Sequence, residues 1–311
     1  MRILVLGAGV SGLSCAHELA RAGHEVELWA RERQQATTST VAAAIWYPYH
    51  VEPQARVVGW ALQSLQRFAE LAEDRARGIR WHRGTELFPP GHAAPDWIRT
   101  LPGSRALEAS RLPQGFAQGF EFDLPVIETP TYMPWLEGEV LKLGVQLRVR
   151  VIDSLRQALD HCPQVVNCTG LGSRALAHDS DLHPVRGQLV RVAQRGFDRF
   201  WFDEHRGEHP TYIIPREHDV VLGSSAERDV VERKTEPDML RSIIERCARL
   251  EPGLRDATVL GTSVGLRPAR SAVRLEPESS PAGRIVHNYG HGGAGVTLSW
   301  GCAQEVAQHF A

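Results

Sequence analysis

Apolar residues near the start of the chain follow two different spacings. Residues 2–6 (RILVL) form a short continuous apolar run, which is typical of a buried parallel strand. After a glycine-rich stretch, apolar positions recur at helical spacing from Leu13 to Ala20, and Gly23 provides a natural helix end. Further apolar residues follow at Val26, Leu28 and Trp29. The pattern predicts a strand, a glycine turn, a helix and a strand in direct succession.

Weaker patterns predict the elements that follow, and residues 51–140 carry no motif with a chemical meaning. The expected elements are a helix over 56–75, strands over 119–126, 129–133 and 145–151, a short helix around Leu155 and Leu159, a strand over 164–167, a turn into a strand over 184–190, and a C-terminal helix with Ala303, Val306, Ala307 and Phe310 apolar.

Three glycines between the first strand and helix have the spacing GxGxxG, at Gly7, Gly9 and Gly12. Gly7 allows a tight turn, Gly9 lets the backbone approach a pyrophosphate, and Gly12 lets the helix pack against the strand. Free N–H groups at the helix start, at Val10 and Ser11, would face the anion. This context predicts a dinucleotide-binding loop, although the motif alone does not choose between NAD and FAD. The alternative is a glycine turn that holds no ligand.

The acidic residue that usually binds the ribose is displaced, because the second strand is followed by Ala30, Arg31 and Glu32. We take Glu32 as the ribose ligand and place Arg31 near the adenosine or its phosphates. The alternative for Glu32 is a solvated carboxylate in a turn.

The segment 36–46 contains four hydroxyl side chains followed by small residues. Hydroxyl groups such as those of Thr38 and Ser39 suit phosphate oxygens, and small residues permit a flat ring to approach closely. The expected contacts of the second kind are Ala43, Ala44 and Ile45. Thr38 or Ser39 would also serve as the N-cap of a helix, and both interpretations hold together.

Composition excludes several other classes of protein. The chain has 311 residues with 42% hydrophobic and 23% charged residues, which suits a globular protein, and its net charge of −2 does not favour nucleic-acid binding. No apolar run approaches the ~20 residues of a membrane helix. An apolar strand starts almost at Met1 without a signal peptide, so we expect a soluble cytoplasmic protein. The five cysteines lack a CxxC pair and metal-binding spacing, which predicts no metal and mostly reduced thiols, with one disulfide left open.

Three later segments, together with the N-terminal pattern, resemble the D-amino-acid oxidase family. They are residues 211–215 (TYIIP), 265–270 (GLRPAR) and 285–295 (IVHNYGHGGAG), the last continuing to 300–303 (WGCA). Segments near residues 38–49, 165–172 and 184–190 also resemble that family. The resemblance spans nearly the whole chain, and it decides for FAD because the family is flavin-dependent.

The resemblance implies an α/β protein (α+β overall) with two interleaved domains. A Rossmann-like FAD-binding domain would comprise residues 1–50, 140–190 and 260–311. A substrate domain, residues 51–139 and 191–259, would be built on a largely antiparallel sheet.

The resemblance also implies how an amino acid is held. Arg267 matches the arginine that binds the substrate carboxylate, and a planar guanidinium suits that task. Tyr212 would give the carboxylate another hydrogen bond, and the backbone carbonyl of Gly293 would accept from the amine. The alternatives are a surface arginine and a core tyrosine. His287 and His291 are expected to be structural, as is Arg270. The further residues expected to contact FAD are Val166, Cys168, Thr169, Gly170, Arg267, Gly290, Gly292, Gly293, Gly295, Val296 and Thr297.

The expected function is FAD-dependent oxidation of D-amino acids, chiefly neutral ones, with oxygen as acceptor. The segment before Tyr212 lacks the second tyrosine of the animal members and is shorter, and Ala294 replaces an aromatic residue, so the substrate's side chain is left open. D-Aspartate oxidase, with Arg206, Arg216, His205 or His209 as the extra cation, and glycine oxidase are the alternatives with the same chemistry. A non-catalytic dinucleotide-binding sensor and a nicotinamide dehydrogenase are the alternatives of other classes. Family habit suggests a homodimer.

Overall fold

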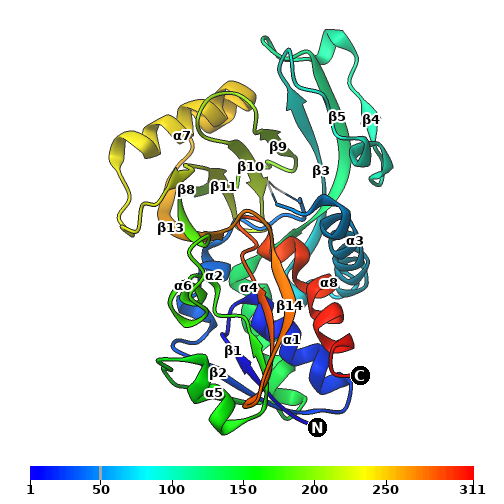
Figure 1. The fold of residues 1–311 in the computed structure, drawn as a ribbon. Coiled ribbons are helices and arrows are strands. Elements are labelled where there is room, and N and C mark those ends of the chain that lie inside the picture. The colour runs from blue at the N-terminus through cyan, green and yellow to red at the C-terminus, as the bar shows by residue number, and fades with distance from the viewer. Residues whose placement is uncertain (49–50) are drawn as a thin grey trace. The chain divides into compact units, whose positions relative to one another are not determined.

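The computed structural model describes residues 1–48 and 51–311, and the chain divides into two compact units. Unit 1 comprises residues 1–78, 129–185 and 267–311, and unit 2 comprises residues 79–128 and 186–266 (Figure 1). Residues 49–50 lie outside the described residues. They include the end of the family-like segment 38–49 and the expected domain boundary at residue 50.

Unit 1 is built on a six-stranded sheet in the order β14-β15-β7-β1-β2-β6. Every neighbouring pair is parallel except β14 with β15. The strands are β1 (Arg2–Leu6), β2 (Glu25–Ala30), β6 (Gln146–Val149), β7 (Gln164–Asn167), β14 (Arg274–Ser280) and β15 (Gly283–Tyr289). Because β1, β7 and β15 are parallel neighbours, the loops that follow them lie at the same edge of the sheet.

Helices pack against this sheet and against each other (Figure 1). They are α1 (Val10–Arg21), α2 (Thr38–Val41), α3 (Gln54–Leu71), α4 (Thr129–Lys142), α5 (Leu155–His161), α6 (Ser173–Leu176) and α8 (Gly295–Gln308). Helix α8 contacts both α1 and α3, and α4 contacts α1. Helix α5 buries Ala158 and Leu159 against Leu4, Leu6 and Val165 of the strands. Among the helices of the described residues, none has the length and apolar character that crossing a membrane requires.

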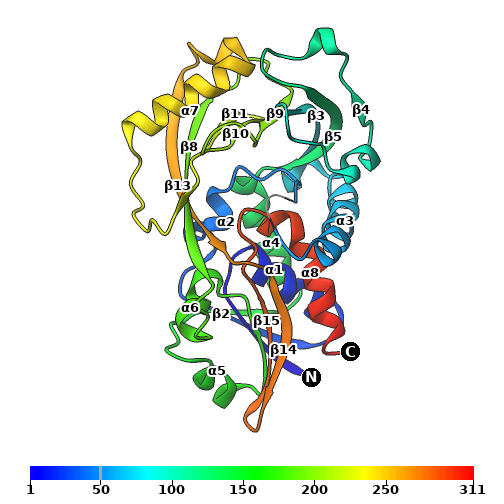
Figure 2. The ribbon, with the colours of Figure 1, turned by 45° about the horizontal axis from the view of Figure 1, so that its top comes forward.

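Unit 2 is built on a largely antiparallel sheet in the order β12-β8-β11-β10-β9-β3-β5-β4, with β13 paired to β8. Its strands are β3 (Ile79–Phe88), β4 (Arg105–Ala106), β5 (Gln118–Ile127), β8 (His183–Ala193), β9 (Phe200–Asp203), β10 (Thr211–Pro215), β11 (Asp219–Gly223), β12 (Glu227–Arg228) and β13 (Val259–Ala269). Helix α7 (Pro237–Leu250) packs Ile243 and Cys247 against Ile213 and Leu222, and so covers one face of the sheet (Figure 2).

The mixed α/β fold confirms the expected class, while some boundaries differ. Residues 51–78 and 129–139 were expected in the substrate domain and belong to unit 1, because α3 packs on α8 and α4 packs on α1. Residues 186–190 and 260–266 were expected in the FAD domain and belong to unit 2. The predicted strand over 129–133 is wrong, since these residues form the start of α4. Pro130 lies in the first turn of that helix, where a missing N–H costs no hydrogen bond.

Candidate active site

The glycine-rich loop after β1 is packed too tightly for any larger residue. Gly7 has φ of +104°, and a Cβ atom there would lie 2.4 Å from the carbonyl oxygen of Cys168. A Cβ atom on Gly12 would lie 1.8 Å from the oxygen of Gly7. Glycine is therefore required at Gly7 by its backbone conformation and by the neighbouring Cys168, and at Gly12 by the packing of α1 on the loop.

The N-terminus of α1 suits a bound anion. The N-cap residue of α1 is Gly9, which has no side chain that could cap the helix. The Val10 N–H instead donates to Oγ of Ser39 at 3.0 Å, and a Cβ atom on Gly9 would lie 3.2 Å from the same oxygen. A hydroxyl group thus lies where backbone N–H groups and the helix dipole favour negative charge. The loop and Ser39 fit the pyrophosphate of a dinucleotide.

The segment around α2 is held in place by hydrogen bonds to its backbone. Thr37 is the N-cap residue of α2, so Thr38 and Ser39 lie inside the helix rather than capping it. Oγ1 of Thr129 donates to the carbonyl oxygens of Thr40 and Ala42, at 2.8 and 3.0 Å. Ala44 has φ of +47°, a left-handed conformation that is uncommon outside glycine and often found at functional sites.

Arg31 and Glu32 directly follow β2, and both side chains are exposed. They stand at the carboxyl end of the strand beside β1, which is where a ribose ligand belongs in this architecture. Their contact with the cofactor stays a prediction.

The turn after β7 is organised by Asn167, which was not among the site residues predicted from the sequence. Asn167 is fully buried, and its Oδ1 accepts from the N–H of Thr169 at 3.2 Å and from Oγ1 of Thr169 at 2.8 Å. The N–H of Cys168 donates to the oxygen of Leu6 at 2.9 Å, which joins this turn to the glycine loop. A polar residue at the end of an apolar strand was the available signal. Val166 has a fully buried side chain and pairs with Val5 in the centre of the sheet.

The third loop at this edge connects β15 to α8. Gly290 and Gly292 have φ of +84° and +53°, which favour glycine. Ala294 is the N-cap residue of α8, without a side-chain cap, so the first N–H groups of the helix are available to a negatively charged group. Oγ1 of Thr297 accepts from the N–H of Tyr47 at 3.0 Å and donates to the carbonyl oxygen of Tyr47 at 2.9 Å. The hydroxyl therefore has no hydrogen left to donate to a cofactor.

Arg267 lies in β13, and the strand that carries it is joined to the glycine loop. The N–H of Gly292 donates to the carbonyl oxygen of Pro268, the next residue after Arg267, at 2.9 Å. Arg267 is half-buried, and Gly293 is exposed at the tip of the loop. One backbone hydrogen bond therefore links the segments of the predicted carboxylate-binding arginine and of the predicted amine-binding carbonyl.

Tyr212 belongs to unit 2, on β10, where it pairs with Gly223 of β11. A Cβ atom on Gly223 would lie 2.0 Å from Cζ and 2.5 Å from the hydroxyl oxygen of Tyr212. The phenol ring therefore lies flat across the neighbouring strand, over a residue without a side chain.

The two histidines near the glycine loop are buried in hydrogen-bonded positions. His291 is 4% exposed and its Nε2 lies 3.0 Å from Oδ1 of Asn288, and burial lowers its pKa to about 4. His287 is fully buried between Asn167 and Glu278, and burial also lowers its pKa. Arg270 donates to Asp179 at 2.9 Å. These contacts agree with the structural roles expected for all three residues.

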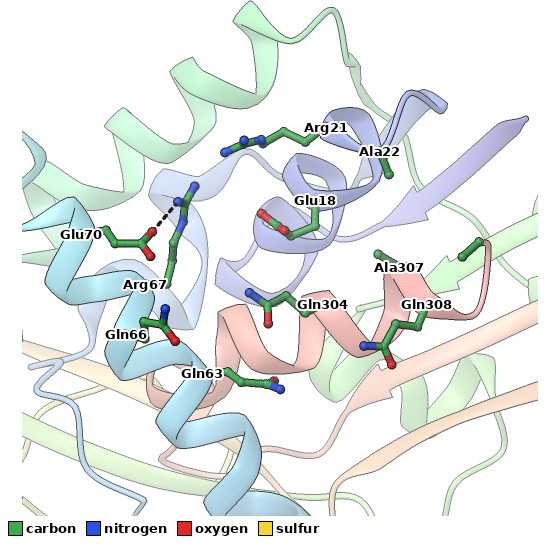
Figure 3. Close-up of a pocket in the computed structure, with 11 residues that line it drawn as sticks. Glu18, Arg21, Ala22, Gln63, Gln66, Arg67, Glu70, Gln304, Ala307 and Gln308 are labelled. Atoms are coloured by element: carbon green, nitrogen blue, oxygen red, sulfur yellow. Dashed lines mark hydrogen bonds and ion pairs between the residues drawn. The ribbon is translucent and has the colours of Figure 1, made fainter.

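A separate polar cavity of about 520 Å³ lies among α1, α3 and α8 (Figure 3). Glu18 and Gln304 line it, and Arg67 donates to Glu70 at 2.9 Å while its guanidinium lies 5.1 Å from the centre of the Trp300 ring. The cavity is lined by the C-terminal parts of α1 and α8, whereas the N-termini of these helices stand at the cofactor edge of the sheet. Its lining contains none of the predicted site residues, so we give it no catalytic role.

The parallel sheet, the glycine loop and the N-termini of α1 and α8, whose N-cap residues give no side-chain cap, define a dinucleotide-binding protein of Rossmann-like type. The sequence model of a family described as FAD dependent oxidoreductase matches residues 2–309. The chain therefore belongs to the family of FAD-dependent oxidoreductases, and FAD is its cofactor. This confirms the predicted cofactor and the predicted family resemblance.

Similar proteins carry related names. A D-amino-acid oxidase of Rubrobacter xylanophilus is 44% identical over 310 residues, covering 98% of this chain and 94% of that protein. A D-aspartate oxidase of Homo sapiens is 33% identical over 323 residues, covering 99% of this chain and 94% of that protein. Among solved structures, glycine oxidase from Geobacillus kaustophilus has a TM-score of 0.83 at 20% identity, covering 99% of this chain and 94% of that chain. At that identity the likeness concerns the fold alone.

Proposed function

We propose that this protein oxidises D-amino acids to the corresponding imino acids, which hydrolyse to 2-oxo acids and ammonia. The observation that carries the proposal is the hydrogen bond from Gly292 to Pro268, because it holds the Arg267 strand against the glycine loop. The 44% identity to a D-amino-acid oxidase over nearly the whole chain supports the same reaction.

The chain's own residues bind and orient the substrate. The guanidinium of Arg267 binds the carboxylate with two parallel hydrogen bonds, and the hydroxyl of Tyr212 donates another. The carbonyl oxygen of Gly293 accepts a hydrogen bond from the neutral α-amine, so the α-hydrogen points in one direction. When bound, FAD would supply the hydride acceptor, and oxygen would be the final electron acceptor, giving hydrogen peroxide. No side-chain base is required, because the amine loses its extra proton before the hydride leaves.

The N-terminus of α8 stabilises negative charge at the cofactor through its free N–H groups, near Gly295 and Val296. Thr38, Ser39 and the loop of Gly7, Gly9 and Gly12 would hold the phosphates of FAD, and Glu32 would hold its ribose. The cytoplasmic location and a homodimer stay predictions.

Two candidate cations for a D-aspartate side chain are already engaged. Arg206 pairs with Asp203 at 2.9 Å, and Arg216 pairs with Asp219 at 2.7 Å. This favours D-amino acids without a side-chain carboxylate over D-aspartate.

The test is an oxygen-electrode screen of the purified yellow protein with D-amino acids, their L forms, D-aspartate and glycine. Arg267→Ala should retain bound FAD, seen as flavin absorbance, and lose turnover of every D-amino acid. Turnover of L forms alone, or near wild-type kcat/KM in Arg267→Ala, would refute the proposal. A protein that binds FAD but consumes no oxygen with any amino acid would instead be the non-catalytic sensor.

A further inference from the structure

One row of residues crosses the sheet of unit 2 at the position of Tyr212. Glu86 of β3 pairs with Phe202 of β9, Phe202 pairs with Tyr212 of β10, and Tyr212 pairs with Gly223 of β11. Paired residues of neighbouring strands project to the same face of a sheet. Glu86 therefore lies on the face that carries the ring of Tyr212, and the row beside it, with Ile213, faces α7.

Glu86 is a buried carboxylate in an aromatic setting. Its side chain is 0% exposed, and Phe88, Phe120 and Phe202 surround its place in the sheet. Nε2 of His205 lies 4.0 Å from Oε1 of Glu86, and the His205 ring stacks on Phe88 with centroids 5.2 Å apart. Burying a carboxylate among apolar residues costs free energy. Such a group on the face of a binding residue is a functional candidate.

The opposite face of the same sheet holds a buried carboxylate with a different environment. Glu121 pairs with Thr85, so it lies on the other face from Glu86, and its side chain is 1% exposed. Arg105, Arg111 and Arg199 all form ion pairs with it, and the pKa of Glu121 is lowered to about 2 by these hydrogen bonds and charges, against the effect of burial. Glu121 thus has three guanidinium partners on the face of α7, whereas Glu86 lies beside His205 on the face of Tyr212.

Glu86 and Tyr212 are two strands apart, so their backbones lie about 9 to 10 Å from each other in the sheet. Under the proposed function, on which this inference rests, the hydroxyl of Tyr212 binds the substrate carboxylate. An amino acid bound to that hydroxyl then lies on the same face of the sheet as Glu86. We propose that Glu86 determines the charge preference of the substrate side chain, favouring cationic side chains and rejecting D-aspartate and D-glutamate.

The size of the effect follows from the charge and the separation. At this range and at an effective dielectric constant near 20, a unit charge changes kcat/KM by about tenfold or more. The neighbouring cation Arg206 does not offset it, because Arg206 pairs with Asp203 and lies over the ring of Phe116, which belongs to the core on the α7 face.

The experiment compares matched substrates on the FAD-loaded enzyme. The first pair is D-lysine and D-norleucine, and the second is D-glutamate and D-glutamine, so each pair differs in one charge. Wild-type protein should favour D-lysine and D-glutamine within their pairs. Glu86→Gln should lower the first ratio of kcat/KM and raise the preference for D-glutamate, each by about tenfold, with D-norleucine changed by less than about twofold. Glu232→Gln, which removes an exposed carboxylate of the same unit, should change neither ratio.

Two further arms make every result informative. Glu86→Asp keeps the charge on a shorter side chain, so its two ratios of kcat/KM should fall between those of wild-type and Glu86→Gln. This variant tests the role of Glu86 if Glu86→Gln does not fold. If no D-amino acid is turned over, the proposed function has failed. The charge preference is then tested by comparing the binding of 6-aminohexanoate with that of hexanoate, each measured by the change in flavin absorbance. Equal ratios in wild-type and Glu86→Gln, or a wild-type preference for D-glutamate over D-glutamine, would overturn the role of Glu86.

Discussion

Replacing Gly223 by alanine tests whether the ring of Tyr212 must lie flat across β11. The new Cβ atom would lie 2.0 Å from Cζ, 2.1 Å from Cε2 and 2.5 Å from the hydroxyl oxygen of Tyr212. Carbon atoms in contact are separated by about 3.5 Å, so the ring has to move by about 1.5 Å. The ring is the end of a flexible side chain, so it moves more easily than the paired strands do.

Moving the ring removes the hydrogen bond that the hydroxyl of Tyr212 donates to the substrate carboxylate, and this loss lowers kcat/KM. Hydrogen bonds to charged groups contribute about 1.5 to 3 kcal/mol, and each 1.36 kcal/mol is a factor of ten. We therefore expect kcat/KM for D-amino acids to fall about 10- to 150-fold in Gly223→Ala, with FAD still bound. Steady-state kinetics and the flavin spectrum measure the two quantities.

A double-mutant cycle separates this mechanism from general damage. Tyr212→Phe already lacks the hydroxyl, so adding Gly223→Ala to it should change kcat/KM little further. Gly253→Ala is the matched control in the same unit, because a Cβ atom there would lie 3.4 Å from Cε1 of Phe197, an ordinary contact. Full additivity of Gly223→Ala and Tyr212→Phe would refute the reasoning.

Two other residues give predictions in unit 1. Gly12→Ala should abolish FAD binding, because its Cβ atom would lie 1.8 Å from a backbone oxygen that cannot move freely. Gly59→Ala is the control and should bind FAD normally, because a Cβ atom there would have nothing within 4 Å. Flavin absorbance after gel filtration measures the bound FAD of each variant. Glu27 forms ion pairs with Arg2 and His161, and its pKa is lowered to about 2 by hydrogen bonds from His161, Trp29 and Arg2, against the effect of burial. Its ionised form therefore stabilises the fold at neutral pH, and this stabilisation is lost as the pH falls from about 4.5 towards 2. Glu27→Gln should lower the free energy of unfolding by about 3 kcal/mol at pH 7. The free energy of unfolding should also fall less steeply below pH 5 in Glu27→Gln than in the wild-type protein, as measured by urea unfolding at several pH values. The same pH dependence in both proteins would contradict this prediction.

Local sequence patterns predicted the elements that depend on neighbours in the chain. The run at residues 2–6 became β1, and the glycine turn and the helix after it became the loop and α1. These elements are specified by apolar spacing and by glycine, both of which are visible in a short window. The expectation of mostly reduced thiols also holds, since all five cysteines are free and buried.

The strand predicted over 129–133 failed because tertiary contacts outweighed local preference. In α4 the hydroxyl of Tyr132 accepts from Nε1 of Trp300 at 2.9 Å, and Oγ1 of Thr129 donates to the backbone of Thr40 and Ala42. Threonine and tyrosine favour strands on average, but partners 89 and 168 residues away decide here.

Glu86, Gly223 and Asn167 were missed for a related reason. Each has a meaning only through the register of strands that are distant in sequence: Glu86 through β9 and β10, Gly223 through the ring of Tyr212, and Asn167 through the loop after β1. A single sequence contains no information on register until the sheet order is known.

The order β15-β7-β1 explains why the family resemblance was nevertheless spread over the whole chain. Three loops, at Gly7, Cys168 and Gly290, belong to segments more than 120 residues apart, and parallel pairing of their strands brings them to one edge of the sheet. Each loop has to satisfy the same cofactor, so each carries glycine or a small residue for its own steric reason. A change in any one of them is therefore felt at FAD, whereas substitutions in unit 2, such as those of Glu86 or Gly223, alter the choice and hold of substrate while FAD stays bound.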